Sequence, residues 1–288
     1  MIERRVIISA DDFGLAPQIN QAVEQAHQRG ALGAAGLMAG GGALSDALER
    51  VRRLPRLDLG LHAALVAAPP CAPPASITSL LGADGQLLGS HAAFVARWLR
   101  GKVRPSEVRE ELDAQLLGLQ AQGVRLTHLD SHQHLHVLPG LAPLFADLAT
   151  RAGVTAIRLP VDVTPGAHIP ARRRAERVLL NALSRRAARV FRARGLLVCG
   201  SILGFAHAGH LTTARLVSGL ASLPAGLSEV VCHPGTSDRE LEKRFGWGYQ
   251  WEAELEALCS PATQGALAEH AIQLTTFGAL SAAGPNAR

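Results

Sequence analysis

The stretch RVIISADDFG, residues 5–14, decides the fold class of this chain. Arg5–Ala10 has the apolar, β-branched composition of a buried strand, and Asp11 and Asp12 follow it directly, before a Phe-Gly turn. The pattern of Pro17–Arg29 then predicts a helix that ends at Gly30. A strand, a polar loop and a helix in succession form the unit from which α/β folds are built.

The same unit repeats along the chain. Further strands are predicted at residues 35–39, 57–62, 124–129, 156–159, 196–203, 229–232 and 272–276. Helices are predicted at residues 43–54, 91–100, 105–122, 140–152, 171–194, 212–222 and 249–269. Repeated strand–helix units favour a parallel sheet, and seven or eight strands in one chain favour a barrel. We therefore expect residues 1–288 to form a single α/β domain, an irregular TIM-like (β/α) barrel with seven or eight parallel strands.

The composition narrows the class of protein. With 48% hydrophobic and only 4% aromatic residues, the chain can bury an aliphatic core. The four cysteines form no CxxC pair, which argues against a zinc ribbon and against a disulfide framework. The N-terminus lacks the apolar region of a signal peptide, and no run of ~20 apolar residues appears, so we expect a cytoplasmic enzyme.

Positive charge is concentrated in one predicted helix. The formal net charge is +5, the pI is about 9.6, and nine arginines fall between Arg172 and Arg194. A basic cluster can attract nucleic acid, anionic lipid or an acidic substrate, and it can equally be the solvated face of a helix. Nucleic-acid binders usually carry a reading motif or stacking aromatics on a basic strand, and because we find neither, no nucleic-acid partner is expected.

Unusual polar residues gather where predicted strands end, and these ends share one face of an α/β barrel, where βα loops build the active site. They are Asp11 and Asp12 after the first strand, His62 at the third, the segment HLDSHQHLH (128–136) at the fourth, Arg158 at the fifth and His233 after the seventh.

Taken singly, some of these residues have simpler explanations. Two aspartates before a turn can cap a helix, and one histidine such as His62 is more often a hydrogen-bonded core residue than a ligand. Four histidines within residues 128–136 are harder to explain by packing, because neutral imidazole is the commonest protein metal ligand. One carboxylate and two imidazoles bind a divalent ion with positions left open. A second carboxylate can take a proton from water and a histidine can protonate a leaving nitrogen, as amide hydrolysis requires.

Several motifs resemble the YdjC-like family of carbohydrate deacetylases. They are ADDFG (10–14), GLH (60–62), HLDSHQHLH (128–136), RLP (158–160) and HPG (233–235), in the family's order and across nearly the whole chain. The resemblance implies Asp12, His62 and His132 as ligands of one divalent ion, magnesium or zinc. It also implies Asp11 as the general base and His233 as the general acid.

The resemblance extends to the neighbouring polar residues. It implies that Arg158 orients the base or binds substrate, and that His128 and Asp130 hold the ligands in place from behind. His134 and His136 would line the substrate groove. The implied substrate is an acetylated amino sugar of the N-acetylglucosamine type, which loses its acetyl group as acetate.

A finer resemblance concerns one branch of the family. The segments LGLHAALVAAPPCAPPASI (59–77), GADGQL (82–87), LGFAHAGHLTTARL (203–216) and WEAELEAL (251–258) are similar to the hopanoid-biosynthesis-associated deacetylases. This implies a hopanoid glycolipid head group as substrate. The amphipathic, basic run 178–198 could then rest on an anionic membrane surface at the inner face, or pack on the barrel with solvated arginines. The family resemblance also implies a homodimer. Ala63 and Ala64 after His62 depart from the bulkier residues common in the family, which widens the site.

Two other functions compete with this hypothesis. Another metal-dependent barrel hydrolase, an amidohydrolase or phosphoesterase, would share the metal but differ in substrate. Amidohydrolase barrels usually show HxH at the end of the first strand, where this chain has Asp11 and Asp12. A non-catalytic basic binding protein would rely on the arginine-rich helix alone, and its chain would bind no divalent metal.

Overall fold

The computed structural model describes residues 3–165 and 169–282, so the ends of the expected 1–288 domain lie outside the described residues. The strands are β1 Arg4–Phe13, β2 Ala34–Leu37, β3 Asp58–Ala63, β4 His128–Ser131, β5 Ala156–Ile157, β6 Ser201–Leu203, β7 Gly226–Cys232 and β8 Ile272–Leu274. The α-helices are α1 Pro17–Arg29, α2 Leu44–Val51, α3 His91–Leu99, α4 Pro105–Ala121, α5 Leu141–Ala152, α6 Ala171–Ala193, α7 Thr213–Ala221, α8 Asp238–Phe245, α9 Trp251–Cys259, α10 Pro261–Glu269 and α11 Phe277–Ala282. Short 3-10 helices are η1 Pro74–Ser76, η2 Thr78–Leu80, η3 His132–Val137 and η4 Phe205–His207.

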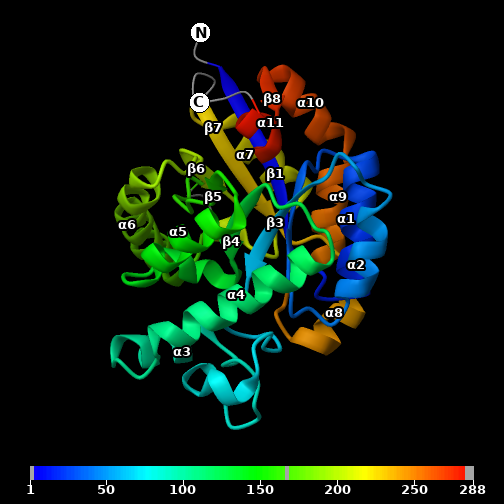
Figure 1. The fold of residues 1–288 in the computed structure, drawn as a ribbon. Helices are drawn as coiled ribbons and strands as arrows, with labels where there is room; N and C mark the ends of the chain where they lie inside the picture. The colour runs from blue at the N-terminus through cyan, green and yellow to red at the C-terminus, as the bar shows by residue number, and fades with distance from the viewer. Residues whose placement is uncertain (1–2, 166–168, 283–288) are drawn as a thin grey trace.

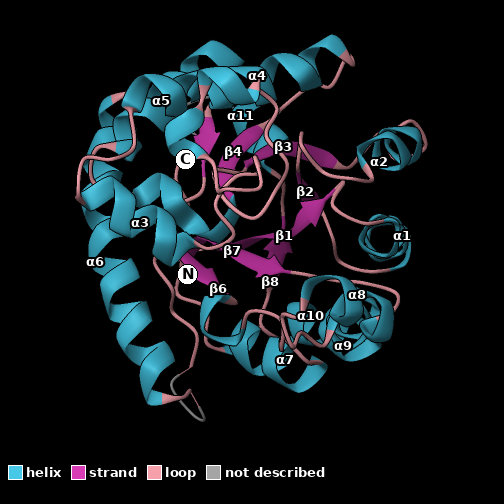
Figure 2. Ribbon diagram, turned by 90° about the horizontal axis from the view of Figure 1, so that it is seen from below, coloured by secondary structure: helices cyan, strands magenta, loops and turns pink. Residues whose placement is uncertain are grey.

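The strands form one parallel sheet in the order β5-β4-β3-β2-β1-β7-β6, and β8 pairs with the beginning of β1. Helices surround the strands, which lie together in the interior (Figures 1 and 2). The sheet curls into a half-barrel. Between its two ends, isolated bridges join Ala156 to Leu197 and Asp162 to Ile202, while the described residues form no strand ladder there. The predicted parallel α/β fold is confirmed at this level.

Several predicted boundaries were wrong. β1 continues to Phe13, so the two aspartates lie inside the strand rather than after it. β4 begins only at His128 and β6 only at Ser201, because the residues before them form connecting loops. The helix predicted at 249–269 is divided at Ser260, where Pro261 starts α10 with a preset φ and no backbone donor. Two short helices, α8 and α11, were not predicted.

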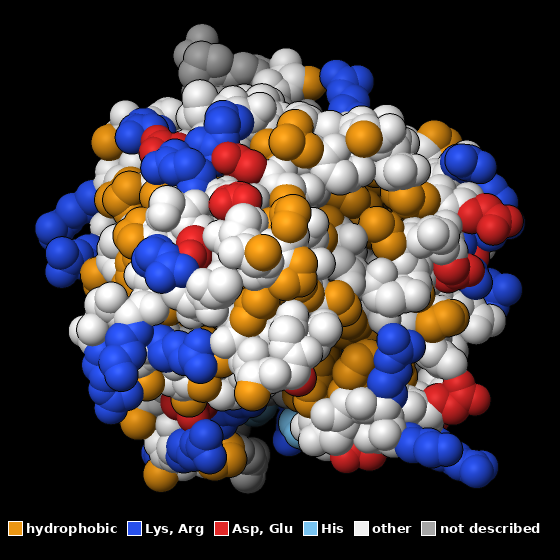
Figure 3. All heavy atoms as spheres, turned by 60° about the horizontal axis from the view of Figure 1, so that its bottom comes forward, with side chains coloured by type: hydrophobic (Ala, Val, Ile, Leu, Met, Phe, Trp, Pro, Cys, Tyr) orange, Lys and Arg blue, Asp and Glu red, His pale blue; other side chains and the backbone are white. Residues whose placement is uncertain are grey.

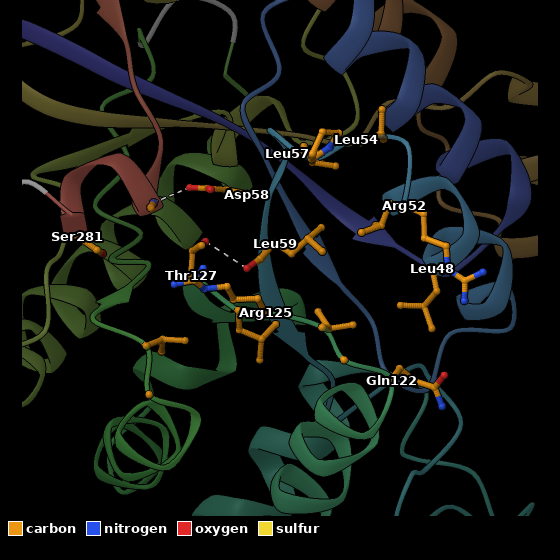
Figure 4. A pocket seen from close by; sticks show the side chains of 18 of the residues that line it. Leu48, Arg52, Leu54, Leu57, Asp58, Leu59, Gln122, Arg125, Thr127 and Ser281 are labelled. Carbon is orange, nitrogen blue, oxygen red and sulfur yellow. Dashed lines mark hydrogen bonds between the residues drawn. The ribbon is translucent and has the colours of Figure 1, made fainter.

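The last helix covers the amino-terminal end of the half-barrel. Phe277 and Leu280 of α11 pack among small and aliphatic strand residues, and the Phe277 ring stacks on His128 with centroids 4.1 Å apart. The Gly278 amide donates to the Asp58 carboxylate at 2.5 Å (Figure 4). A hollow of about 780 Å³ lies beside this contact, lined by residues that precede the strands. It is therefore remote from the carboxyl ends of the strands.

No helix in the described part of the chain is both long enough and apolar enough to cross a membrane. α6, the longest with 23 residues, contains most of the clustered arginines.

Candidate metal centre and active site

Three side chains from three strand ends converge on one point. Asp12 Oδ1 lies 3.0 Å from His132 Nδ1 and 3.5 Å from His62 Nε2, and these two nitrogens are 3.4 Å apart. All three residues are at most 6% exposed. Asp12 Oδ1 is buried and has no hydrogen-bond partner among the described residues, which calls for another partner such as an ion. We call Asp12, His62 and His132 the triad.

Unusual backbone geometry presents the triad. A register shift interrupts the pairing of β1 with β2 between Ala10 and Phe13, and Asp12 has φ +64°, in the left-handed region that non-glycine residues rarely adopt. Directly after His132, Gln133 and His134 both have φ +56°. Non-glycine residues in this region cost free energy, and such residues cluster at functional sites.

The charges around the triad suit a cation. Burial raises the pKa of Asp12, but His132 and His62 lower it by more than burial raises it. The pKa of Asp12 therefore lies well below its usual value. Burial lowers the pKa of His62, yet Asp130 and Asp11 hold it well above the usual value. One carboxylate oxygen and two imidazole nitrogens are a donor set of hydrolytic divalent ions, so the residues present fit such an ion.

Asp130 holds His62 from behind. Both carboxylate oxygens of Asp130 lie 3.0 Å from His62 Nδ1, which leaves Nε2 directed at the triad. This is the arrangement expected around a metal-bound histidine, in which a carboxylate fixes the tautomer and ring orientation. Burial raises the pKa of Asp130, but Arg158 and His62 lower it far more.

Arg158 follows β5 and contacts carboxylates of three strands, β1, β4 and β7. Its guanidinium donates two hydrogen bonds to Asp11, at 2.7 and 2.8 Å, and one to Glu229 at 2.9 Å, and it forms an ion pair with Asp130. Arg158 is fully buried and does not line the cleft, and its guanidinium contacts the carboxylates alone among charged groups of the described residues. Burial lowers the pKa of Arg158, but the three carboxylates hold it well above its usual value.

His233 follows β7 and faces a buried acid. The His233 backbone amide donates to Glu254 at 2.5 Å, and its Nδ1 lies 3.9 Å from the same carboxylate oxygen. Burial raises the pKa of Glu254, while His233 opposes that rise. His233 Nδ1 is buried and has no hydrogen-bond partner among the described residues.

His128 does not hold a triad residue. Its Nδ1 lies 2.9 Å from Thr127 Oγ1, its ring stacks on Phe277, and burial lowers its pKa to about 3. Gly60 explains the position of the ring, since a Cβ there would come within 2.4 Å of it. The expectation that His128 supports the ligands is therefore corrected to a packing role.

The last two loop histidines differ from each other. His136 is fully buried between aromatic rings, with Ser131 Oγ at 2.8 Å and the Arg158 carbonyl oxygen at 3.0 Å. It does not line the cleft, which corrects that expectation. His134 does line the cleft, and its buried Nδ1 has no hydrogen-bond partner in the described part of the chain.

The triad lies in a cleft of about 870 Å³ that also contains Asp11 and His233. From the triad the cleft extends between α3 and α6 over a mainly aliphatic surface, which we call the apolar arm: Val95, Ala96, Leu99, Leu135, Leu138, Leu179, Leu180 and Leu183. Leu99 is 74% exposed and Leu179 is 62% exposed. In Figure 3, Lys and Arg side chains lie along both edges of the face shown, including the left, the side where α6 lies in Figure 1.

Four residues around the site were missed by sequence reasoning. They are Glu229, Glu254, Trp247 and Tyr249. The sequence could have pointed to Glu229, because a charged residue within the buried strand SEVVC is unusual and suggests a functional role. Glu254 carried no such signal, since acidic residues are ordinary in a helix such as WEAELEAL.

A model of the YdjC-like protein family matches residues 5–269. The chain belongs to this family. Among YdjC-like relatives, a carbohydrate deacetylase of Mus musculus is 32% identical, with 98% of this chain and 96% of the relative covered. A carbohydrate deacetylase of Vibrio cholerae is 30% identical, with 97% of each chain covered. A solved structure from Enterococcus faecalis V583, described as a cellobiose-phosphate cleavage protein, covers 96% of this chain and 98% of its own at 24% identity and a TM-score of 0.77. That likeness supports the single-domain α/β fold.

Proposed function

We propose that this chain is a metal-dependent carbohydrate deacetylase, which hydrolyses the amide of an N-acetylglucosamine-type amino sugar and releases acetate. The observation that carries the proposal is the triad, in a cleft that Asp11 and His233 also line. The names of the YdjC-like relatives support the same activity. We further propose that residues 1–288 act as one catalytic domain.

The residues divide the work of amide hydrolysis between them. Asp12, His62 and His132 would hold a divalent ion, magnesium or zinc, which would supply Lewis-acid activation of water and of the amide carbonyl. Asp11, oriented by Arg158, takes a proton from the attacking water. His233 gives a proton to the amide nitrogen as the C–N bond breaks, so that the sugar leaves as an amine.

The apolar arm supports a lipid-linked form of the substrate. A free oligosaccharide would gain little from an aliphatic surface, whereas an apolar aglycone would bury it. We propose that the enzyme accepts a glycolipid whose sugar reaches the triad and whose lipid lies between α3 and α6. A hopanoid glycolipid is the candidate named by sequence resemblance.

A glycolipid substrate would place the enzyme at a membrane surface. The arginines of α6, together with Leu99 and Leu179 at the rim of the apolar arm, support peripheral binding to an anionic bilayer. We propose a cytoplasmic enzyme that docks at the inner membrane face, and a homodimer. Replacement of Arg185, Arg186 and Arg189 by Gln should abolish sedimentation with anionic liposomes. Unchanged sedimentation would refute the membrane contact.

Acetate release tests the activity itself. The protein is treated with EDTA, reconstituted with single metals, and supplied with N-acetylglucosaminyl substrates as free sugar and as glycolipid. Acetate that appears only with metal would establish the deacetylase, and the preferred substrate would decide between sugar and lipid. Metal binding without acetate from either substrate would refute the proposal and favour another metallohydrolase. A chain that binds no divalent metal would favour a binding protein.

A further inference from the structure

Aromatic residues are scarce in this chain, yet four alternate within seven positions. They are Phe245, Trp247, Tyr249 and Trp251, which include two of the three tryptophans and the only tyrosine. The segment, which we call the aromatic loop, joins α8 to α9. Trp251 is fully buried in the core, and Phe245, Trp247 and Tyr249 are only partly buried where they pack against it.

The aromatic loop brings two rings to the site. Trp247 and Tyr249 are half-buried and both line the cleft. The Trp247 ring centroid is 5.9 Å from that of His132, a triad residue. The Tyr249 ring lies edge-to-face with His233 at 5.3 Å. The two rings therefore flank the space between the proposed metal ion and the proposed acid.

The two rings are held in place from behind. Phe245, which does not line the cleft, stacks on Trp247 with centroids 4.8 Å apart, and the fully buried Trp251 lies 5.4 Å from Tyr249. Gly209, at φ +76°, leaves the room that Tyr249 occupies, because a Cβ there would come within 2.1 Å of the ring. The Gly209 carbonyl also accepts a hydrogen bond from the amide of Gln250 at 2.7 Å. Supported rings of this kind form a fixed surface and not a mobile flap.

We propose that Trp247 and Tyr249 form the subsite that binds the sugar ring and so select a cyclic amino sugar over other acetamides. A pyranose ring has one apolar C–H face and a rim of hydroxyls. An aromatic face takes the apolar side, and a phenol hydroxyl can hydrogen-bond the rim. Burial raises the pKa of Tyr249 above its usual value, so its hydroxyl keeps its proton and remains a donor. The inference rests on the proposed function, since it names what the same cleft selects.

The test compares Trp247→Leu with Trp247→Phe and with a matched control. Trp98→Leu removes another half-buried tryptophan, which donates to the Pro139 carbonyl outside the cleft. Acetate release is measured with di-N-acetylchitobiose and with N-acetylethanolamine, which has the acetamide but no ring. Calorimetric titration of the EDTA-treated proteins with the disaccharide measures binding without turnover.

We expect Trp247→Leu to lower kcat/KM for the disaccharide about tenfold more than for N-acetylethanolamine, and to weaken disaccharide binding about tenfold. Trp247→Phe should recover most of the lost kcat/KM for the disaccharide and most of the lost disaccharide binding. Trp98→Leu should change neither the ratio of kcat/KM between the two substrates nor the affinity for the disaccharide. Equal losses on both substrates, or undiminished disaccharide binding, would overturn the subsite even in an active deacetylase. A wild-type protein that releases no acetate would instead overturn the proposed function, and the calorimetry would still decide the subsite.

Discussion

Replacement of Arg158 by Met should destabilise the protein strongly. Arg158 is the shared counter-charge of three buried carboxylates, Asp11, Asp130 and Glu229. Removing one partner of a buried ion pair leaves an uncompensated charge and costs about 3–5 kcal/mol. Because three carboxylates lose their partner together, we expect the free energy of unfolding at pH 8 to fall by roughly the upper half of that range.

The loss should depend on pH. Burial already raises the pKa of Glu229 to about 7, against the opposing effect of Arg158, and without the arginine this pKa rises further. When folding raises the pKa of a carboxyl group, the fold loses stability as the pH rises from the ordinary pKa of that group to its raised pKa. The variant should therefore lose less stability at pH 5 than at pH 8.

Urea unfolding followed by circular dichroism at both pH values measures this loss. The control is Arg151→Met, which removes a partly exposed partner of Asp113 and should cost less than about 1 kcal/mol. A cost below about 1 kcal/mol for Arg158→Met at pH 8, or the same cost at both pH values, would refute the reasoning. Glu229→Gln added to Arg158→Met should recover part of the loss, because it removes one of the unpaired charges.

Three further predictions concern the site and the fold. Asp11→Asn should keep the bound metal, measured by mass spectrometry, and lower turnover by roughly a hundredfold to ten-thousandfold, the usual worth of a general base; loss of the metal instead would mean that the two aspartates have exchanged roles. Asp12→Ala should lose metal and activity together, and a variant that keeps a full equivalent of metal would remove Asp12 from the ligand set. Phe277→Ala should lower the free energy of unfolding by about 3–5 kcal/mol, because the ring is buried and stacks on His128. A change below about 1 kcal/mol would show that α11 does not stabilise the half-barrel.

Much of the fold could be predicted because hydrophobic periodicity is a local signal. The buried strand at Arg5–Ala10 and the helix at Pro17–Arg29 follow from apolar patterning and from the proline and glycine at the helix ends. The short strands could not be bounded in the same way. β5 and β6 contain only two and three residues, and pairing with their neighbours, not their own composition, makes them strands.

By itself, the sequence determined a parallel α/β fold and the set of polar residues at the strand ends. The reason is that the succession of strands, and the polar residues that end them, can be recognised from short stretches of sequence. Family resemblance also named Asp12, His62 and His132 as one ligand set, and only the tertiary structure decided how the other polar residues lie around them. It separated the four loop histidines, placing His132 in the triad, His134 in the cleft, and His128 and His136 in the interior. It also brought Glu229 to Arg158 and Trp247 to His132 across long stretches of chain. The reason is physical: a side chain's partners depend on strand register, turn geometry and packing, and these are set by the whole fold.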